Sequence, residues 1–143
     1  VPVGAFVLNE KTAKASLAPG DHGTTYGGNP FACAAVAKVL ELYETDHIVE
    51  HVREITPYLE EKLENLKEDI SCITARRGKG LMQGLVIGNG VKVGDVVNAA
   101  LAEGLLVISA GSDVLRLVPP LVITKAHIDE MIQKLSAALK NCG

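Results

Sequence analysis

The sequence predicts an α+β fold in which a small sheet is covered by helices. After residue 70 the apolar residues form short, strand-like runs, and glycine or proline ends each run. The four runs are residues 71–77, 81–87, 105–109 and 114–118. A helical pattern follows each pair of runs. The first, at residues 93–103, is expected to end at Gly104 as a left-handed cap, and the second to begin at Thr124 as N-cap, so the order is ββαββα with hairpin-length links.

A long amphipathic helix is predicted ahead of these strands, at residues 46–69. Its apolar residues recur at spacings of three and four and form one stripe, so only one side faces a core. The stripe consists of Ile48, Val52, Ile55, Leu59, Leu63, Leu66 and Ile70. Pro57 interrupts it and is expected to kink the helix or split it in two. Residues 50–69 carry seven acidic and three basic side chains, which we interpret as a solvated helix face rather than a partner-binding patch.

The first 45 residues have a different character. Residues 1–8 form an apolar, strand-like run with no initiator methionine, so we expect them to continue a longer chain; a short helical turn is expected at 9–17. Asn29 and Pro30 then predict the start of a helix. The helix at 30–44 is apolar around most of its circumference. Such a helix is normally buried on most sides.

Composition excludes several classes of protein. The 143 residues are 48% hydrophobic and 22% charged, with a net charge of −3, which is typical of a folded domain rather than of a disordered chain. No apolar run approaches the roughly 20 residues of a membrane helix, and no basic segment precedes the apolar start, so neither membrane insertion nor export is expected. With no Trp and only 3% aromatic residues, no basic stripe with stacking rings is available for nucleic acid.

The cysteines and histidines predict no metal site. Cys33, Cys72 and Cys142 are odd in number and widely spaced, and they form no CxxC pair or Cys/His cluster. This usage favours a reducing, cytoplasmic compartment. Cys33 lies in the apolar helix and is interpreted as a small core residue. The four histidines show no ligand spacing, and only His22 lies in a loop of interest.

The glycine-rich loop at residues 20–30 is the first candidate site. It holds four glycines, the adjacent hydroxyls of Thr24 and Thr25, and the helix start at Asn29. Backbone amides at glycines and at a helix N-terminus can bind an anion. The loop matches neither a P-loop nor a GxGxxG fingerprint, so the residues alone leave an ordinary glycine-rich turn as the alternative.

Arg116 is the second candidate. It lies in the middle of a predicted strand and shares a face with Val114 and Val118. A guanidinium there must find an anion or reach water, and its planar fork suits a carboxylate. The alternative is an arginine on an edge strand that extends into solvent. The basic residues at 76–79 are interpreted as a solvated hairpin tip rather than as a phosphate clamp.

Four segments, taken together, resemble one family. They are VPVGA at residues 1–5, PGDHGTTYGGNP at 19–30, GKGLM at 78–82 and LRLVPPL at 115–121. In this order they resemble the C-terminal part of the class III aminotransferases that use pyridoxal phosphate, and the resemblance covers all 143 residues. It implies a homodimer of fold type I with a large, mainly parallel domain and a smaller C-terminal α+β domain with an antiparallel sheet. Residues 1–45 would be the end of the large cofactor-binding domain and residues 46–143 the small domain.

The resemblance also implies roles for the candidate residues. Thr25 matches a threonine that hydrogen-bonds the pyridoxal phosphate of the neighbouring subunit, and Thr24 matches a contact on the substrate side. Arg116 matches the arginine that pairs with the α-carboxylate of the amino-acid or 2-oxo-acid substrate.

The family's Schiff-base lysine lies upstream of the VPVGA segment, and none of Lys11, Lys14 or Lys38 matches it. No catalytic residue is therefore expected within this chain, which we interpret as a C-terminal fragment, inactive alone, of a pyridoxal-phosphate aminotransferase. Two alternatives stay open: a family member that takes a different ω-amino acid, and a free-standing carboxylate-binding module without chemistry.

Overall fold

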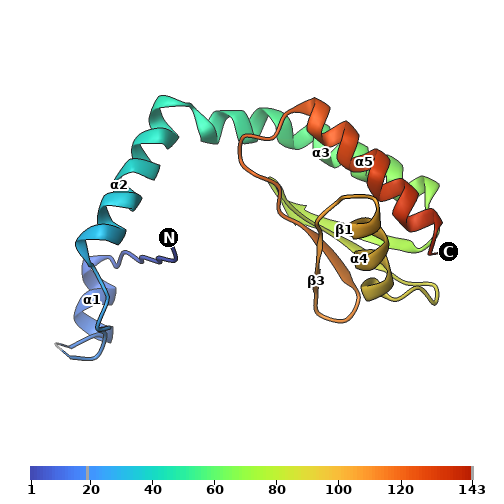
Figure 1. Cartoon of the computed structure of the whole chain (residues 1–143). Coiled ribbons are helices and arrows are strands. Elements are labelled where there is room, and N and C mark those ends of the chain that lie inside the picture. Colours follow the sequence, from blue (N-terminus) through green and yellow to red (C-terminus); the bar gives the residue numbers. More distant parts are fainter. Residues whose placement is uncertain (19, 143) are drawn as a thin grey trace. The chain divides into compact units, whose positions relative to one another are not determined.

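The computed structural model describes residues 1–18 and 20–142, and it divides them into two compact units (Figure 1). Unit 1 is Val1–His47, and unit 2 begins at Ile48 and continues to the end of the described chain.

Unit 1 contains two helices, α1 (Glu10–Ser16) and α2 (Pro30–Thr45). The predicted start of α2 is confirmed, because the Asn29 side chain accepts a hydrogen bond from the Ala32 amide at 2.9 Å and Pro30 occupies the first turn. The strand predicted at residues 1–8 is wrong. Those residues lie outside any helix or strand, and no strand pairs with them among the described residues of unit 1; a strand exists only where a neighbour completes its hydrogen bonds.

The apolar helix α2 is not covered within unit 1. Ala32 is its one buried side chain, whereas Phe31 is 76% exposed and Leu40 is 58% exposed. Cys33 is exposed as well, so its interpretation as a core residue is wrong. The reason is that residues 1–18 and 20–47 supply no second layer of apolar side chains that packs on this helix.

Unit 2 has the predicted ββαββα order and is α+β. Its four-stranded antiparallel sheet has the spatial order β1-β2-β4-β3. The elements, from α3 to α5, are α3 (Ile48–Asp69), β1 (Ile73–Lys79), β2 (Met82–Ile87), α4 (Val93–Ala102), β3 (Ile108–Ala110), β4 (Val114–Leu117) and α5 (Lys125–Lys140). In Figure 1, α3 and α5 run side by side, and α4 packs against α5 as well as against β3 and β4.

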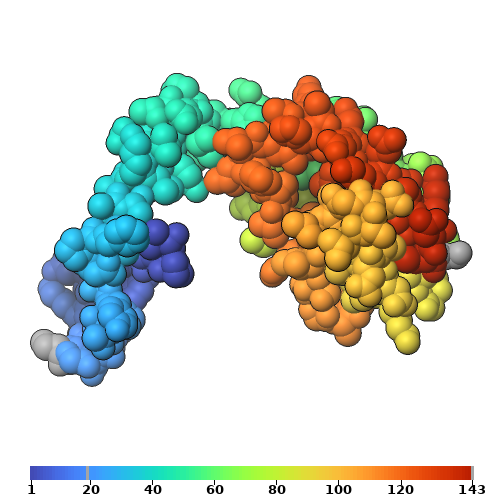
Figure 2. Space-filling view, viewed as in Figure 1, coloured from blue at the N-terminus to red at the C-terminus, as the bar shows by residue number. Residues whose placement is uncertain are grey.

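The core of unit 2 lies between these helices and one face of the sheet. The stripe predicted for α3 is confirmed, since Ile55, Leu59 and Leu63 are buried in the same cluster as Leu85 of β2 and Leu115 of β4. In the space-filling view the side chains of unit 2, coloured green to red, form a continuous packed mass (Figure 2). The opposite face of the sheet carries no helix of this unit, because all three helices contribute to the one cluster.

The helix α3 continues through Pro57, so the predicted split does not occur. Apolar residues on both sides of Pro57, Ile55 and Leu59, pack into the same core and hold the two turns together. The hydroxyl of Thr56 also donates to the carbonyl of Val52, one turn earlier in the helix, at 2.6 Å.

The predicted ends of α4 and α5 are confirmed. Gly104 follows α4 with a φ of +72°, a left-handed conformation that favours glycine. Thr124 caps α5, accepting from the His127 amide while the His127 ring nitrogen accepts from the Thr124 amide. Across the described part of the chain, no helix combines the length and the apolar character needed to cross a membrane.

Candidate functional site

The loop before α2 is folded by its own hydrogen bonds. The Gly27 amide donates to the Thr24 carbonyl at 3.2 Å, and the side-chain amide of Asn29 donates to the Tyr26 carbonyl at 2.8 Å. Asn29 also caps α2, so the loop and the helix start form one structure. Pro19, the first residue of the predicted motif, lies outside the described residues.

Glycine is required at two positions of this loop. A Cβ atom on Gly27 would lie 2.8 Å from the Thr24 hydroxyl oxygen, closer than real contacts allow, and Gly28 has a φ of +66°. The absence of a side chain at Gly27 therefore lets the Thr24 hydroxyl approach the backbone.

Thr24 and Thr25 are exposed, and neither hydroxyl takes part in a hydrogen bond with another described residue. Thr24 lines a hollow of about 1240 Å³ between residues 2–6, the loop and α2, whereas Thr25 does not line it. Residues 20–29 contain no lysine or arginine. The loop can thus offer hydroxyl and amide donors to an anion, but the positive charge that a phosphate needs must come from other residues.

Arg116 lies on β4, an interior strand, where it pairs with Gly84 of β2 and Ile108 of β3. Its neighbours Leu115 and Leu117 are buried in the core, so Arg116 points to the uncovered face of the sheet. The edge-strand alternative is therefore wrong: Arg116 is exposed because no helix of unit 2 covers that face. Among the described residues no carboxylate pairs with its guanidinium.

Arg76 does not lie at a solvated hairpin tip, contrary to the sequence interpretation. Its side chain is only 17% exposed. Its Nε donates to Glu64 Oε1 at 2.7 Å, and its Nη1 donates to Gln83 Oε1 at 2.7 Å. Gln83 is 1% exposed, and its own amide donates to the Gly80 carbonyl at 2.7 Å. These bonds satisfy a polar cluster at the edge of the core.

This cluster connects α3 to the β1–β2 hairpin. Lys67 first, and then Arg76, hold the pKa of the Glu64 carboxyl below its ordinary value. Glu60 also lies beside Arg76, so two of the acidic residues of α3 serve an internal contact rather than a solvated face. The strand register explains the position of Arg76: it lies opposite Leu85, which is buried in the core, so Arg76 faces the helices. The cluster is structural, because every group in it already has a protein partner.

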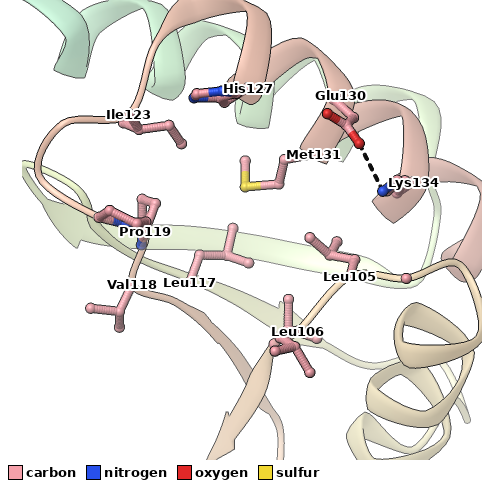
Figure 3. A pocket seen from close by; sticks show the side chains of 13 residues that line it. Leu105, Leu106, Leu117, Val118, Pro119, Ile123, His127, Glu130, Met131 and Lys134 are labelled. Carbon is pink, nitrogen blue, oxygen red and sulfur yellow. Dashed lines mark ion pairs between the residues drawn. The ribbon is translucent and has the colours of Figure 1, made fainter.

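A groove of about 430 Å³ lies between α5 and the segments around β3 and β4 (Figure 3). Leu105, Leu117 and Met131 line it, and an ion pair between Glu130 and Lys134, 2.8 Å long, stands at its rim. Lys134 lowers the pKa of Glu130. The groove is mainly apolar and contains none of the candidate residues Thr24, Thr25 or Arg116. No cluster of three or more potential metal ligands occurs in residues 1–18 and 20–142.

Comparison with known proteins identifies the family. The profile described as aminotransferase class-III matches residues 1–139. The chain belongs to the class-III aminotransferase family. Enzymes of this family use pyridoxal phosphate and act on small molecules.

Individual relatives agree with this assignment. Over 133 residues the chain is 41% identical to an acetylornithine aminotransferase of Gloeobacter violaceus. The aligned residues make up 92% of this chain and 32% of the relative. The chain is 45% identical over 140 residues to the acetylornithine aminotransferase of Methanocaldococcus jannaschii, covering 94% of this chain and 33% of the relative. An ornithine aminotransferase structure from Plasmodium yoelii matches with a TM-score of 0.81 and 30% identity, over 89% of this chain and 34% of that one. The chain thus spans about a third of the length of the relatives it matches.

Proposed function

We propose that these residues form the C-terminal part of an acetylornithine aminotransferase. That enzyme would transfer an amino group from N-acetylornithine to 2-oxoglutarate, giving N-acetylglutamate semialdehyde and glutamate, a step of arginine biosynthesis in the cytoplasm. The observation that carries the proposal is the identity of 41% to 45% to proteins of that name over almost the entire chain.

We assign residues 1–45 to the end of the large cofactor-binding domain and residues 46–143 to the small domain of a homodimer. Two observations support this assignment. The chain divides into compact units between His47 and Ile48. The second unit buries its own core, whereas α2 leaves Phe31 and Leu40 exposed, as expected if the rest of a large domain covers them.

The residues of the loop fit part of a phosphate group. The free hydroxyl of Thr25 and the backbone amide of Gly28, which donates to no other described residue, can donate to a phosphate oxygen. Thr25 would hold the phosphate of the cofactor bound in the neighbouring subunit, and Thr24 would face the substrate. When bound, pyridoxal phosphate withdraws electrons from the carbon that carries the reacting amino group, so that its proton can be removed; this is the δ-carbon of N-acetylornithine and the α-carbon of glutamate.

Arg116 would hold the α-carboxylate. Its guanidinium is exposed on a rigid interior strand and has no acidic partner among the described residues, so it is free for a ligand. A bidentate pair with the carboxylate fixes the orientation of the α-carbon. A fixed orientation favours amino transfer, because the reacting atoms are then held in place.

Arg116→Ala in the intact enzyme tests this role. We expect kcat/KM for glutamate to fall by roughly 10- to 100-fold, the loss of hydrogen bonds to a charged group, with little change in stability. Arg116→Lys should recover little, because an ammonium is a point charge and lacks the fork. Arg53→Ala, an exposed arginine on α3, is the control. A normal KM and kcat for glutamate in Arg116→Ala would show that Arg116 is structural.

The substrate is tested with the intact protein, supplied with N-acetylornithine or ornithine together with 2-oxoglutarate. Formation of glutamate from N-acetylornithine, at a kcat/KM well above that for ornithine, supports the proposal. The reverse preference supports an ornithine aminotransferase, which the match to the Plasmodium yoelii structure keeps as the second candidate. No transamination of either amine, with carboxylate binding preserved, would support a non-catalytic module.

A further inference from the structure

One row of residues crosses the uncovered face of the sheet. Arg77 of β1 pairs with Gly84 of β2, Gly84 pairs with Arg116 of β4, and Arg116 pairs with Ile108 of β3. Residues directly opposite one another in antiparallel strands point to the same face. Since Arg116 points away from the helices, Arg77 does so as well. Two arginines therefore lie on this face with one glycine between them.

The two arginines form an unneutralised pair of like charges. Two strand spacings separate their Cα atoms, a distance of about 10 Å. Both side chains are exposed, and neither forms an ion pair within the part of the chain that the structure describes. Arg76, on the opposite face of the same strand, instead pairs with two carboxylates. The sheet thus neutralises its inward arginine and leaves the two outward ones free for an anion.

Gly84 opens the space between them. A Cβ atom at Gly84 would lie 3.0 Å from Val114 Cγ1 and 3.8 Å from Arg77 Cγ. The stem of Arg77 therefore leans over the glycine, in the direction of β4. A side chain at position 84 would crowd both Val114 and the stem of Arg77, and would keep Arg77 from leaning toward β4.

We propose that Arg77 and Arg116 bind one and the same carboxylate across Gly84, which makes Arg77 a second residue for carboxylate recognition. This inference rests on the proposed function, which assigns the carboxylate of the α-amino acid or 2-oxo acid to Arg116. A carboxylate has about four lone-pair sites on its two oxygens, so it can accept hydrogen bonds from two guanidinium groups at once. The anion also removes the repulsion between the two arginines.

Binding is tested on the 143-residue chain by NMR, from the Nε–Hε signals of its arginines. Butyrate is the probe, the neutral butyramide is its isostere, and the ionic strength is kept constant. We expect the signals of Arg77 and Arg116 to move with butyrate along one binding curve and to stay in place with butyramide. The signal of Arg53, on α3, should not move. Movement of Arg116 without Arg77, or of neither, would overturn the proposal.

A matched pair of variants separates a shared ligand from a general effect of charge. Arg77→Gln should weaken butyrate binding at Arg116 by about tenfold, the loss of one hydrogen-bonding charged partner. Arg53→Gln makes the same charge change on an exposed arginine and should leave that binding unchanged. Equal weakening in the two variants would mean that net charge alone is responsible, and the proposal would be wrong.

Kinetics of the intact enzyme distinguish this inference from the proposed function. If both arginines bind one carboxylate, Arg77→Gln combined with Arg116→Gln should lower kcat/KM for glutamate little more than Arg116→Gln alone. If the losses in kcat/KM of the two single variants multiply in the double variant, the two arginines act independently. That result would overturn this inference but not the proposed function, because the enzyme would still transaminate. An intact protein that does not transaminate would overturn the proposed function, and the NMR result would still decide whether the two arginines share a carboxylate.

Discussion

Unit 1 contains the apolar helix α2 and unit 2 the amphipathic helix α3, and the apolar side chains of the two helices differ in how far they are covered. In unit 1, α2 exposes Phe31 and Leu40. In unit 2, α3 buries Leu59 and Leu63 completely against the sheet. An apolar helix face therefore indicates that other apolar side chains pack on it. Those side chains can come from any part of the protein.

The polar contacts of the two units also differ, in how far apart their partners lie in the sequence. In unit 1 the ion pair between Lys14 and Glu10 joins residues of a single helix turn. In unit 2, Tyr58 donates to Asp129, 71 residues away, at 2.7 Å. Contacts within one helix support that helix only, whereas contacts between distant segments make the whole unit unfold together.

The largest expected effect comes from the core. Leu63→Ala should lower the free energy of unfolding by about 2–5 kcal/mol, because it leaves a cavity among residues that cannot close it. Leu40→Ala, the same substitution in α2, should change it by less than about 0.5 kcal/mol. Urea unfolding followed by far-ultraviolet circular dichroism measures both. Equal losses would show that α2 is packed as tightly as α3.

The polar cluster around Arg76 gives an intermediate effect. Arg76→Met should cost about 1–3 kcal/mol, since it removes the donor to the buried Gln83 oxygen and to Glu64. Lys14→Met, which breaks the exposed pair with Glu10 in unit 1, should leave the unfolding midpoint in place. Chemical denaturation of the two variants at pH 7 makes the comparison.

The pH dependence of this cluster has a definite sign. The pKa of Glu64 is lower in the folded chain than its ordinary value of 4.5, so its charged form stabilises the fold above that pH. The stability difference between the natural chain and Glu64→Gln should therefore be largest near neutral pH and shrink as the pH falls below 4.5. A difference that grew on acidification would contradict the assigned contacts with Lys67 and Arg76.

The smallest effect is expected at the helix caps. Thr124→Ala should lower the free energy of unfolding of unit 2 by about 1 kcal/mol, because the His127 amide loses its acceptor. Asn29→Ala removes the equivalent bond in α2. Its effect should be confined to the helicity and hydrogen exchange of α2, because Ala32 is the one buried side chain of that helix. Loss of protection throughout unit 2 in Asn29→Ala would show that the two units unfold together.

Local patterns predicted much of this architecture. The three- and four-residue spacing of α3, the caps at Asn29 and Thr124, and the left-handed Gly104 are as the sequence predicts. Each depends on residues within a few positions of one another. The α+β order of unit 2 follows from the same local periods.

Long-range contacts account for the predictions that were wrong. Residues 1–8 have a strand pattern without a partner strand, and Cys33 lies on a helix without a covering layer. Arg76 was interpreted as solvated because its acidic partners on α3 lie 12 and 16 residues before it. No local pattern shows which segment will lie against another.

Residue order alone predicts the helix boundaries, the apolar stripe of α3 and the family resemblance, because each of them depends on residues that are near one another in the chain. The interior position of β4 became known only from the tertiary structure. The same is true of Arg116 and Arg77, which point to the uncovered face on either side of Gly84. The physical reason is that strand order and register bring together residues 39 positions apart, which local propensity does not encode.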